Sequence, residues 1–440
     1  MVSPALSHPP SPFDLPPFRR FLAARVATTM AYLMVAVAVG WQVYDLTRRP
    51  LDLGLVGLAQ FIPALLLVLV VGLVADRYPR QRIAALSQGT GLLICLALAL
   101  LSGLGLIRET LIFALVFAIG ASRAFESPTM QALAPSLVPT DLFPRAAAWY
   151  GSATQGAVIL GPALGGLLYL AGPTTVYGVA AGLYALAAGL TAGLPQSKAA
   201  PRAPAPVGLE SLFAGIAFIR SRQVMLGAIS LDMFAVLLGG ATALLPVYAR
   251  DILHTGSWGL GLLRSAPAIG AVTMALVLAR HPLKRGVGRI MLKAVAVFGL
   301  GTLVFALSPW FSLSLLALTV MGAADMISVV VRSSLVQLQT PDAMRGRVSA
   351  VNAMFIGTSN QLGEFESGLT AAWFGTVPAV VLGGLGTLAV VALWWRLFPR
   401  LRDADRLEGE TETGADGARP RAGGAGASRR EPTQAKQSGT

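Results

Sequence analysis

The chain has 440 residues, of which 55% are hydrophobic and only 12% charged, and its mean hydropathy is +0.67. Soluble domains carry roughly a quarter charged residues, so this composition excludes an ordinary soluble globule. The net charge of +13 does not indicate a nucleic-acid partner, because the basic residues fall in short segments between apolar runs. A single cysteine, Cys95, excludes an intramolecular disulfide and a thiolate metal cluster.

The first part of the chain combines a short polar start with a series of apolar segments. Residues 1–17 are rich in Pro and Ser and lack the basic start and apolar core of a cleavable signal peptide, so we expect a disordered cytoplasmic N-terminus. A spanning helix needs about 20 mostly apolar residues. Residues 18–194 hold six such segments and are expected to form one six-helix bundle, with spans at 19–46, 52–75, 82–106, 110–133, 144–170 and 173–194.

A polar break divides the chain near its middle. Residues 195–223 form a cytoplasmic linker that begins with several prolines and continues with helical periodicity at 209–220, which predicts an interfacial helix. Residues 224–398 predict a second six-helix bundle, and residues 399–440 predict a disordered basic cytoplasmic tail. The expected spans of the second bundle are 224–249, 257–279, 287–308, 311–336, 347–373 and 376–398.

The two halves repeat each other at an offset of 202 residues. This offset aligns Arg145 with Arg347, Gly161 with Gly363 and Gly166 with Gly368. The expected fold is therefore all-α and integral to the membrane, with twelve transmembrane helices in two pseudo-symmetric six-helix bundles. Parallel repeats of this kind build a cavity at the bilayer midplane, which rocking of one half opens to either side. The repeat therefore makes the chain a transporter candidate.

The distribution of Arg and Lys predicts the orientation. Cytoplasmic loops of bacterial membrane proteins hold the excess of positive charge. Most basic residues lie before the first span, in alternate loops and after residue 396, whereas the other loops hold only Arg48, Arg49, Arg108 and Arg250. We therefore expect a multi-pass protein of the inner cell membrane with both termini in the cytoplasm.

The segment from Gly72 to Arg82 lies in the expected cytoplasmic loop between spans two and three, and it contains Asp76 followed by Arg77. With Gly four residues before Asp-Arg, a turn and further basic residues such as Arg80, it resembles the loop signature of the major facilitator superfamily, although Pro79 replaces the usual Gly. The resemblance implies that Asp76 contacts a helix end or an Arg of the other half and locks the outward-facing state. A basic loop with an incidental Asp is the alternative.

The fifth span carries a second signature, which includes Gly161, Pro162, Gly165 and Gly166. It resembles the glycine and proline motif of the superfamily's exporters, with Ala157 in place of the first Gly, and so implies export. Close helix packing is the alternative use of the same small residues. Further segments narrow the resemblance to the branch that contains the bacterial enterobactin exporter and related secretion-type efflux proteins. They are 123–128, 322–325, 332–337, 340–347 and 360–368.

Ionisable residues within spans are costly unless they face a cavity or a partner, so they are candidate functional residues. They lie in spans one, four, seven and ten, which line the central cavity in the superfamily. Arg123 falls opposite Asp325 by pseudo-symmetry and is also spaced to pair with Glu126 on its own helix. Structural ion pairing is the alternative for each residue. The set is Arg25, Arg123, Glu126, Asp232, Asp325 and Arg332.

Two acidic residues break the symmetry of span eleven. Glu364 and Glu366 follow Arg347 by 17 and 19 residues, about 25 to 29 Å along a helix, which predicts a position near the extracytoplasmic mouth. Two interpretations stay open. The pair attracts cationic cargo or protons, or it lies in water at the mouth.

The energy source is inferred by exclusion. None of the four lysines follows the Gly of a Walker-type phosphate loop, and the three histidines are far apart, so neither ATP, zinc nor a catalytic residue is expected, and no cofactor is implied. Proton exchange remains, because a cavity carboxylate can alternate between protonated and ionised forms. Asp232 has no basic neighbour one helical turn away and is the first candidate, followed by Glu126 and Asp325.

We therefore expect a monomeric secondary transporter that exports a small organic molecule, siderophore-like or drug-like, by alternating access in exchange for protons. Its partners are the cargo, protons and the lipid bilayer. A lipid or lysolipid transporter of the same fold is one alternative, and it predicts access from the bilayer through a side opening. A membrane receptor or assembly protein that does not transport is the other.

Overall fold

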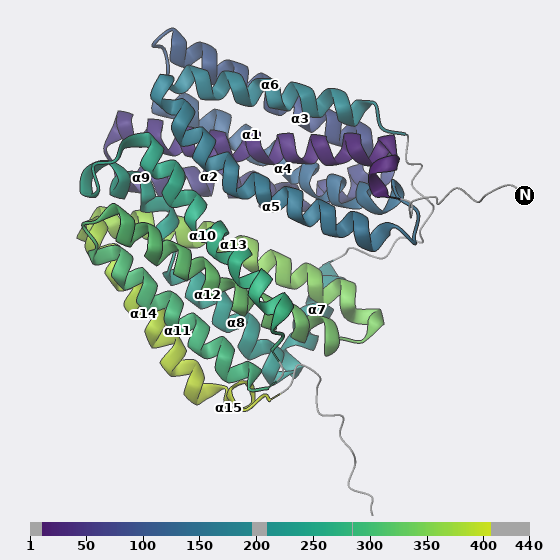
Figure 1. The fold of residues 1–440 in the computed structure, drawn as a ribbon, viewed down its shortest axis with the longest axis vertical. Coiled ribbons are helices and arrows are strands. Elements are labelled where there is room, and N and C mark those ends of the chain that lie inside the picture. The colour runs from purple at the N-terminus through teal and green to yellow at the C-terminus, as the bar shows by residue number, and fades with distance from the viewer. Residues whose placement is uncertain (1–10, 196–208, 284, 406–440) are drawn as a thin grey trace, which may run out of the picture.

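The computed structural model describes residues 11–195, 209–283 and 285–405, and its ribbon shows two bundles of helices (Figure 1). Backbone groups in a bilayer must bond within their own segment, which is why apolar runs of this length fold as helices. Proline in the first turn begins α1, α2, α5 and α6, where its missing N–H costs nothing. The first bundle holds α1 (Pro16–Thr47), α2 (Pro50–Arg77), α3 (Arg80–Gly103), α4 (Glu109–Leu133), α5 (Phe143–Leu168) and α6 (Pro173–Ala192).

The second bundle follows α7 (Leu209–Ser221), the helix expected in the linker. Its seventh span is not one helix, because α8 ends at the Gly239-Gly240 pair and short turns then lead through α9 to a π-helical stretch at Tyr248–Ile252. The remaining elements are α8 (Gln223–Leu238), α9 (Leu245–Val247), α10 (Gly256–Arg280), α11 (Val287–Leu307), α12 (Phe311–Leu338), α13 (Asp342–Phe374), α14 (Thr376–Leu397) and α15 (Pro399–Arg402).

Eleven helical segments among the described residues are long and apolar enough to span a membrane. The helix α13 is long enough but is too polar to qualify by composition, and it lies in the second bundle as the counterpart of α5. Glycines with positive φ, Gly172 before α6 and Gly375 before α14, turn the chain at equivalent points of the two halves. The predicted all-helical membrane fold is confirmed, eleven of the twelve expected spans qualify by length and composition, and α13 begins five residues earlier than expected.

The described ends of the chain are more ordered than the sequence indicated. The ring of Phe13 packs edge-on against Trp149 at 5.0 Å, so residues 11–17 are not the disordered segment we expected. The helix α15 follows α14 directly, and Gly288 N–H donates to the Ala404 carbonyl at 3.1 Å. The expectation of disorder from residue 399 is therefore wrong as far as 405. The expectations for residues 1–10, 196–208 and 406–440 lie outside the described part.

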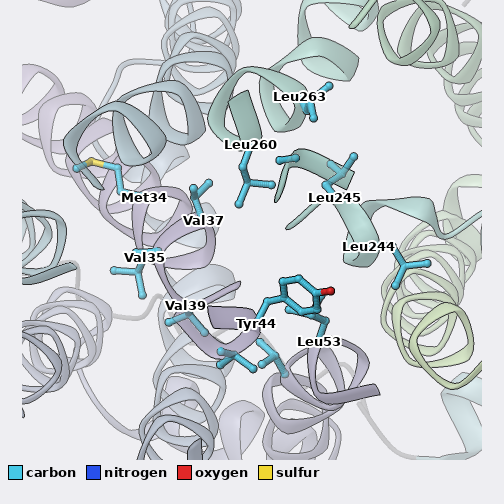
Figure 2. Close-up of a cluster of buried hydrophobic side chains, with 14 of the residues drawn as sticks. Met34, Val35, Val37, Val39, Tyr44, Leu53, Leu244, Leu245, Leu260 and Leu263 are labelled. Atoms are coloured by element: carbon cyan, nitrogen blue, oxygen red, sulfur yellow. The ribbon is translucent and has the colours of Figure 1, made fainter. Parts of the chain in front are cut away.

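The two bundles meet at one end and diverge at the other (Figure 1). We call the end where α1 ends and α9 lies the closed end, and the end where α1 begins and α7 lies the open end. One apolar cluster joins both bundles at the closed end and includes Met34, Tyr44, Leu53, Leu245 and Leu260 (Figure 2). Toward the open end, the apolar clusters of the described residues each stay within one bundle.

Candidate functional site

Charged side chains connect the two bundles at the closed end. The end of α1 and the π-helical stretch after α9 face each other, so that Arg250 pairs with Asp45 and Arg48 approaches Asp251 at 3.6 Å. The hydroxyl of Tyr44 also donates to the Asp251 carboxylate. These groups are partly exposed, so water and salt weaken each pair. Together they form a polar lock at the closed end, beside the apolar cluster.

Small residues allow the bundles to approach below this lock. A Cβ atom added at Gly166 of α5 would lie 2.4 Å from the Ser257 carbonyl of α10, and the Ser265 hydroxyl donates to the Ile159 carbonyl at 2.6 Å. On the other side, a Cβ atom at Gly368 of α13 would lie 2.9 Å from the Cα of Gly54 in α2. The seams between α5 and α10 and between α2 and α13 are therefore tight near the closed end.

The same helices leave space between them farther along. Added Cβ atoms at Gly72 of α2, Gly156 of α5 and Gly357 of α13 would have no heavy atom within 4 Å. Between the tight and the loose regions lies a central cavity of two adjoining chambers, which share Tyr32, Gln60 and Gln361. The halves thus enclose a cavity that is sealed from the closed end.

The apex chamber, about 230 Å³, lies nearest the closed end and takes side chains from both halves. Arg264 of α10 and Glu364 of α13 line it from the second bundle, and Pro162 of α5 lines it from the first. A Cβ atom added at Gly57 would lie 2.6 Å from Glu364 Oε2, and one at Gly40 would lie 3.6 Å from Arg264 Nη2. Both charged groups therefore extend across the interface into places that glycine leaves open.

The position of Glu364 corrects the prediction of an exposed mouth. Because α13 runs on to Phe374, Glu364 lies ten residues before its end, about 15 Å inside the helix. It lines the apex chamber, beneath the seal. Glu366 accepts a hydrogen bond of 2.7 Å from Thr370 on its own helix. Sequence reasoning missed Arg264 altogether, although an arginine inside an expected span was a sufficient signal.

The seam chamber, about 440 Å³, adjoins the apex chamber and contains Arg123 as expected for a cavity residue. Its guanidinium carbon lies 3.5 Å from the centroid of the Tyr32 ring, which is a cation–π contact. The Tyr32 hydroxyl donates to Gln60 Oε1 at 2.8 Å. Among the described residues no carboxylate lies within ion-pair distance of Arg123, so the expected pair with Glu126 is absent in this state.

Asp232, the first candidate for proton coupling, has a basic partner on another helix. Its carboxylate pairs with Arg332 of α12 and accepts a hydrogen bond of 3.1 Å from Ser328. Both charged side chains are buried, with 6% and 4% of their surfaces exposed. The absence of a basic neighbour on its own helix therefore does not leave Asp232 unpaired, and the alternative of a structural pair within the second bundle accounts for both residues.

The other predicted residues fall in different surroundings. Asp325 lines a third chamber of about 180 Å³ together with Glu364, which connects it to the central cavity. Glu126 is buried, and its Oε1 atom has no hydrogen-bond partner among the described residues. Arg25 lies 5.8 Å from the ring centroid of Tyr150, near the open end of the first bundle. The structure therefore brings Arg123 and Asp325 to the cavity system and leaves Arg25 outside it.

The loop signature lies at the open end, where the halves are apart. Arg77 is exposed, and Arg80 donates to the Ala132 carbonyl at 3.2 Å within the first bundle. The side chain of Asp76 lies outside the described atoms, so its gating contact stays a prediction. Gly72 has open space around it, as above, and its gating role also stays a prediction.

The signature of span five packs the helices of the closed end. A Cβ atom added at Gly161 would lie 2.9 Å from the Leu33 Cβ, and one at Gly165 would lie 2.8 Å from the Met34 Cα, both in α1. Gly166 faces α10 of the other half, and Pro162 lines the apex chamber. The motif thus joins α5 to α1 and across the interface, and these contacts support the packing interpretation.

Several solved structures share this arrangement of helices. A bacterial homolog of the human lysosomal transporter Spinster has a TM-score of 0.68 at 11% identity, and 88% of this chain and 97% of that chain are covered. The nucleoside transporter NupG, as its D323A mutant, has a TM-score of 0.66 at 15% identity, with 87% and 100% covered. At these identities the likeness shows the fold alone, and that fold is the one of the major facilitator superfamily.

Sequence relatives are more specific. The enterobactin exporter EntS of Citrobacter koseri is 27% identical over 396 residues, which cover 88% of this chain and 93% of that protein. EntS of Shigella boydii is 26% identical over the same length. A family model described as transmembrane secretion effector matches residues 7–414. The chain therefore belongs to the transmembrane secretion effector family of the major facilitator superfamily and is a secondary transporter rather than an enzyme.

Proposed function

We propose that this transporter exports a small organic molecule from the cytoplasm in exchange for protons. The observation that carries the proposal is the central cavity, which lies between two halves that are joined at one end and apart at the other. Its charged groups come from both halves, Arg123 from the first and Arg264 and Glu364 from the second. Rocking the halves about the cavity would expose the same groups to either side, which is alternating access.

We assign the orientation from the basic residues at the two ends of the helices. The closed end carries Arg48, Arg49, Arg108 and Arg250 among its loops, whereas the open end carries most of the remaining arginines. The positive-inside rule then assigns the open end to the cytoplasm and makes this an inward-facing state. A cysteine at Ser221 on α7, in a Cys95→Ala background, should react with an impermeant thiol reagent only after cells are lysed. Labelling in intact cells would contradict this orientation.

Glu364 is the carboxylate that we assign to proton exchange. It lines the apex chamber beneath the seal, has no ion-pair partner in the described part of the chain, and faces Gly57 across the interface. Arg264 lines the same chamber, so gain or loss of a proton at Glu364 changes the charge balance between the halves. Asp232 is less suited, because its charge is held by Arg332. Asp325, which shares a chamber with Glu364, is the second candidate.

The direction of transport rests on the relatives. The curated relatives are named enterobactin exporters, and the family model is that of a secretion effector. We therefore propose export by a monomer, with a siderophore-like or drug-like molecule as cargo. Purified protein in vesicles with an acidic lumen should concentrate its cargo from a panel of siderophores, macrolides and lipophilic cations. Dissipating the pH gradient should abolish the concentration, and transport that ignores the gradient would overturn proton exchange.

A further inference from the structure

The seam chamber lies between α2 and α4 of the first half and α13 of the second. Phe61, Ala64 and Leu65 form its wall on α2, and Met354 and Gly357 belong to its wall on α13. The glycine contacts described above hold the two helices together near the closed end, whereas a Cβ atom added at Gly357 would meet no heavy atom within 4 Å. The chamber therefore occupies the part of the seam where Gly357 leaves open space.

The outer side of this wall is the surface that a bilayer would cover. Ile62, Leu65 and Leu66 expose 39%, 51% and 69% of their surfaces, on a helix that is long and apolar enough to span a membrane. Leu65 both lines the chamber and belongs to this exposed apolar face. The apolar wall of the chamber is thus continuous with the surface that faces acyl chains.

The inner side of the chamber is polar. Arg123 lies over Tyr32 without a carboxylate partner among the described residues, and Gln361 Oε1 has no hydrogen-bond partner there. A guanidinium inside a membrane favours a compensating anion. The chamber therefore has a cationic inner end and an apolar outer end, and a volume of about 440 Å³ suits a small ligand.

We propose that the cargo is an amphiphile with an anionic head group, which enters from the bilayer through the seam between α2 and α13. Its head binds Arg123 beside Tyr32 and Gln361, and its apolar chain leads outward past Leu65 and Met354. That this amphiphile is transported rests on the proposed function. Its binding in the seam chamber can be tested without any transport measurement.

The first experiment measures lipid access to the seam in vesicles of phosphatidylcholine. A Gly357→Cys variant in a Cys95→Ala background, labelled with bimane, should be quenched by brominated acyl chains, since an added Cβ meets no atom within 4 Å there. A label at Ala36→Cys, in the apex chamber, should not be quenched. Equal quenching at both positions, or none at Gly357, would overturn access from the bilayer.

The second experiment measures binding of two probes with the same head group, N-dodecanoylglycine and N-butanoylglycine. Binding is read from the bimane emission at Gly357→Cys, which changes when a probe displaces the brominated chains that quench it. The long chain should bind at least about tenfold more tightly, because its methylenes leave water. Arg123→Gln should weaken binding of both probes about tenfold, through loss of a charged hydrogen bond. Equal affinity of the two chains, or indifference to Arg123→Gln, would overturn the proposal.

A matched pair of variants separates the chamber wall from the surrounding surface. Leu65→Asn should weaken binding of the long probe alone, whereas Leu66→Asn, an exposed residue outside the chamber lining, should leave it unchanged. If both variants act alike, the chain does not pass Leu65. If the wild-type protein gives these binding results but shows no pH-driven transport, the proposed proton exchange is refuted and the proposed binding site in the seam is not.

Discussion

The buried pair of Asp232 and Arg332 should hold α8 against α12, and its removal tests the structural interpretation. The two side chains expose 6% and 4% of their surfaces, and Ser328 supplies one further hydrogen bond to the carboxylate. Breaking such a pair from one side leaves an uncompensated charge and costs about 3 to 5 kcal/mol. Arg332→Met should therefore lower the free energy of unfolding by about that amount, less whatever protonation of Asp232 recovers.

Removing both charges should restore most of the stability. In Asp232→Leu with Arg332→Met no charge stays buried, and replacement of a buried pair by apolar residues is often neutral or stabilising by about 1 to 4 kcal/mol. The assay is unfolding of the purified protein by SDS in mixed micelles. Asp45→Asn serves as the control, because an exposed pair contributes at most about 1 kcal/mol.

Two results would refute this reasoning. One is an Arg332→Met variant as stable as the wild type, and the other is a double variant whose loss equals the sum of the single losses. The pair lies within the second bundle, so the double variant should also keep pH-driven transport. Loss of that transport alone, with stability restored, would return Asp232 to the role that the sequence suggested.

The contacts at the closed end yield two further predictions. Both are measured with a Thr242→Cys variant, whose cysteine lies in the apex chamber and is labelled by an impermeant thiol reagent added outside intact cells. Gly166→Ala should increase labelling, because its Cβ would lie 2.4 Å from a backbone oxygen of α10, whereas Gly156→Ala, with open space around it, should not. Arg250→Gln should shift the population toward the outward-open state by about fivefold at most, the equivalent of about 1 kcal/mol, and high salt should reduce this difference. Unchanged labelling in either variant would contradict the corresponding contact.

The spans were predictable because length and apolar composition are sufficient to identify membrane helices in a sequence. Helical periodicity predicted α7 in the linker, and ionisable residues inside the expected spans pointed to Arg123 and Asp325 as cavity residues. Length and apolar composition failed at the seventh span, where the Gly239-Gly240 pair and Pro246 were available as signals of a broken helix. Glu364 was placed too near the mouth, although the expected span already continued nine residues beyond it to residue 373.

Other features depend on packing that sequence spacing does not reveal. The partner of Asp232 lies 100 residues away on α12, and only the approach of that helix to α8 selects it. Arg123 turned to Tyr32 of α1 instead of to the acidic residue one turn along its own helix. Arg264, by contrast, satisfied the same criterion as the other charged residues and could have been found from the sequence.

The most direct test of proton-coupled export is transport by Glu364→Gln in vesicles with an imposed pH gradient, with Glu366→Gln as the matched control two residues away. Wild type and control should concentrate cargo in an acidic lumen. Glu364→Gln should lose this concentration but still exchange labelled for unlabelled cargo, because exchange needs no change of charge at that position. If Glu364→Gln concentrates cargo at the wild-type rate, Glu364 does not carry the exchanged proton.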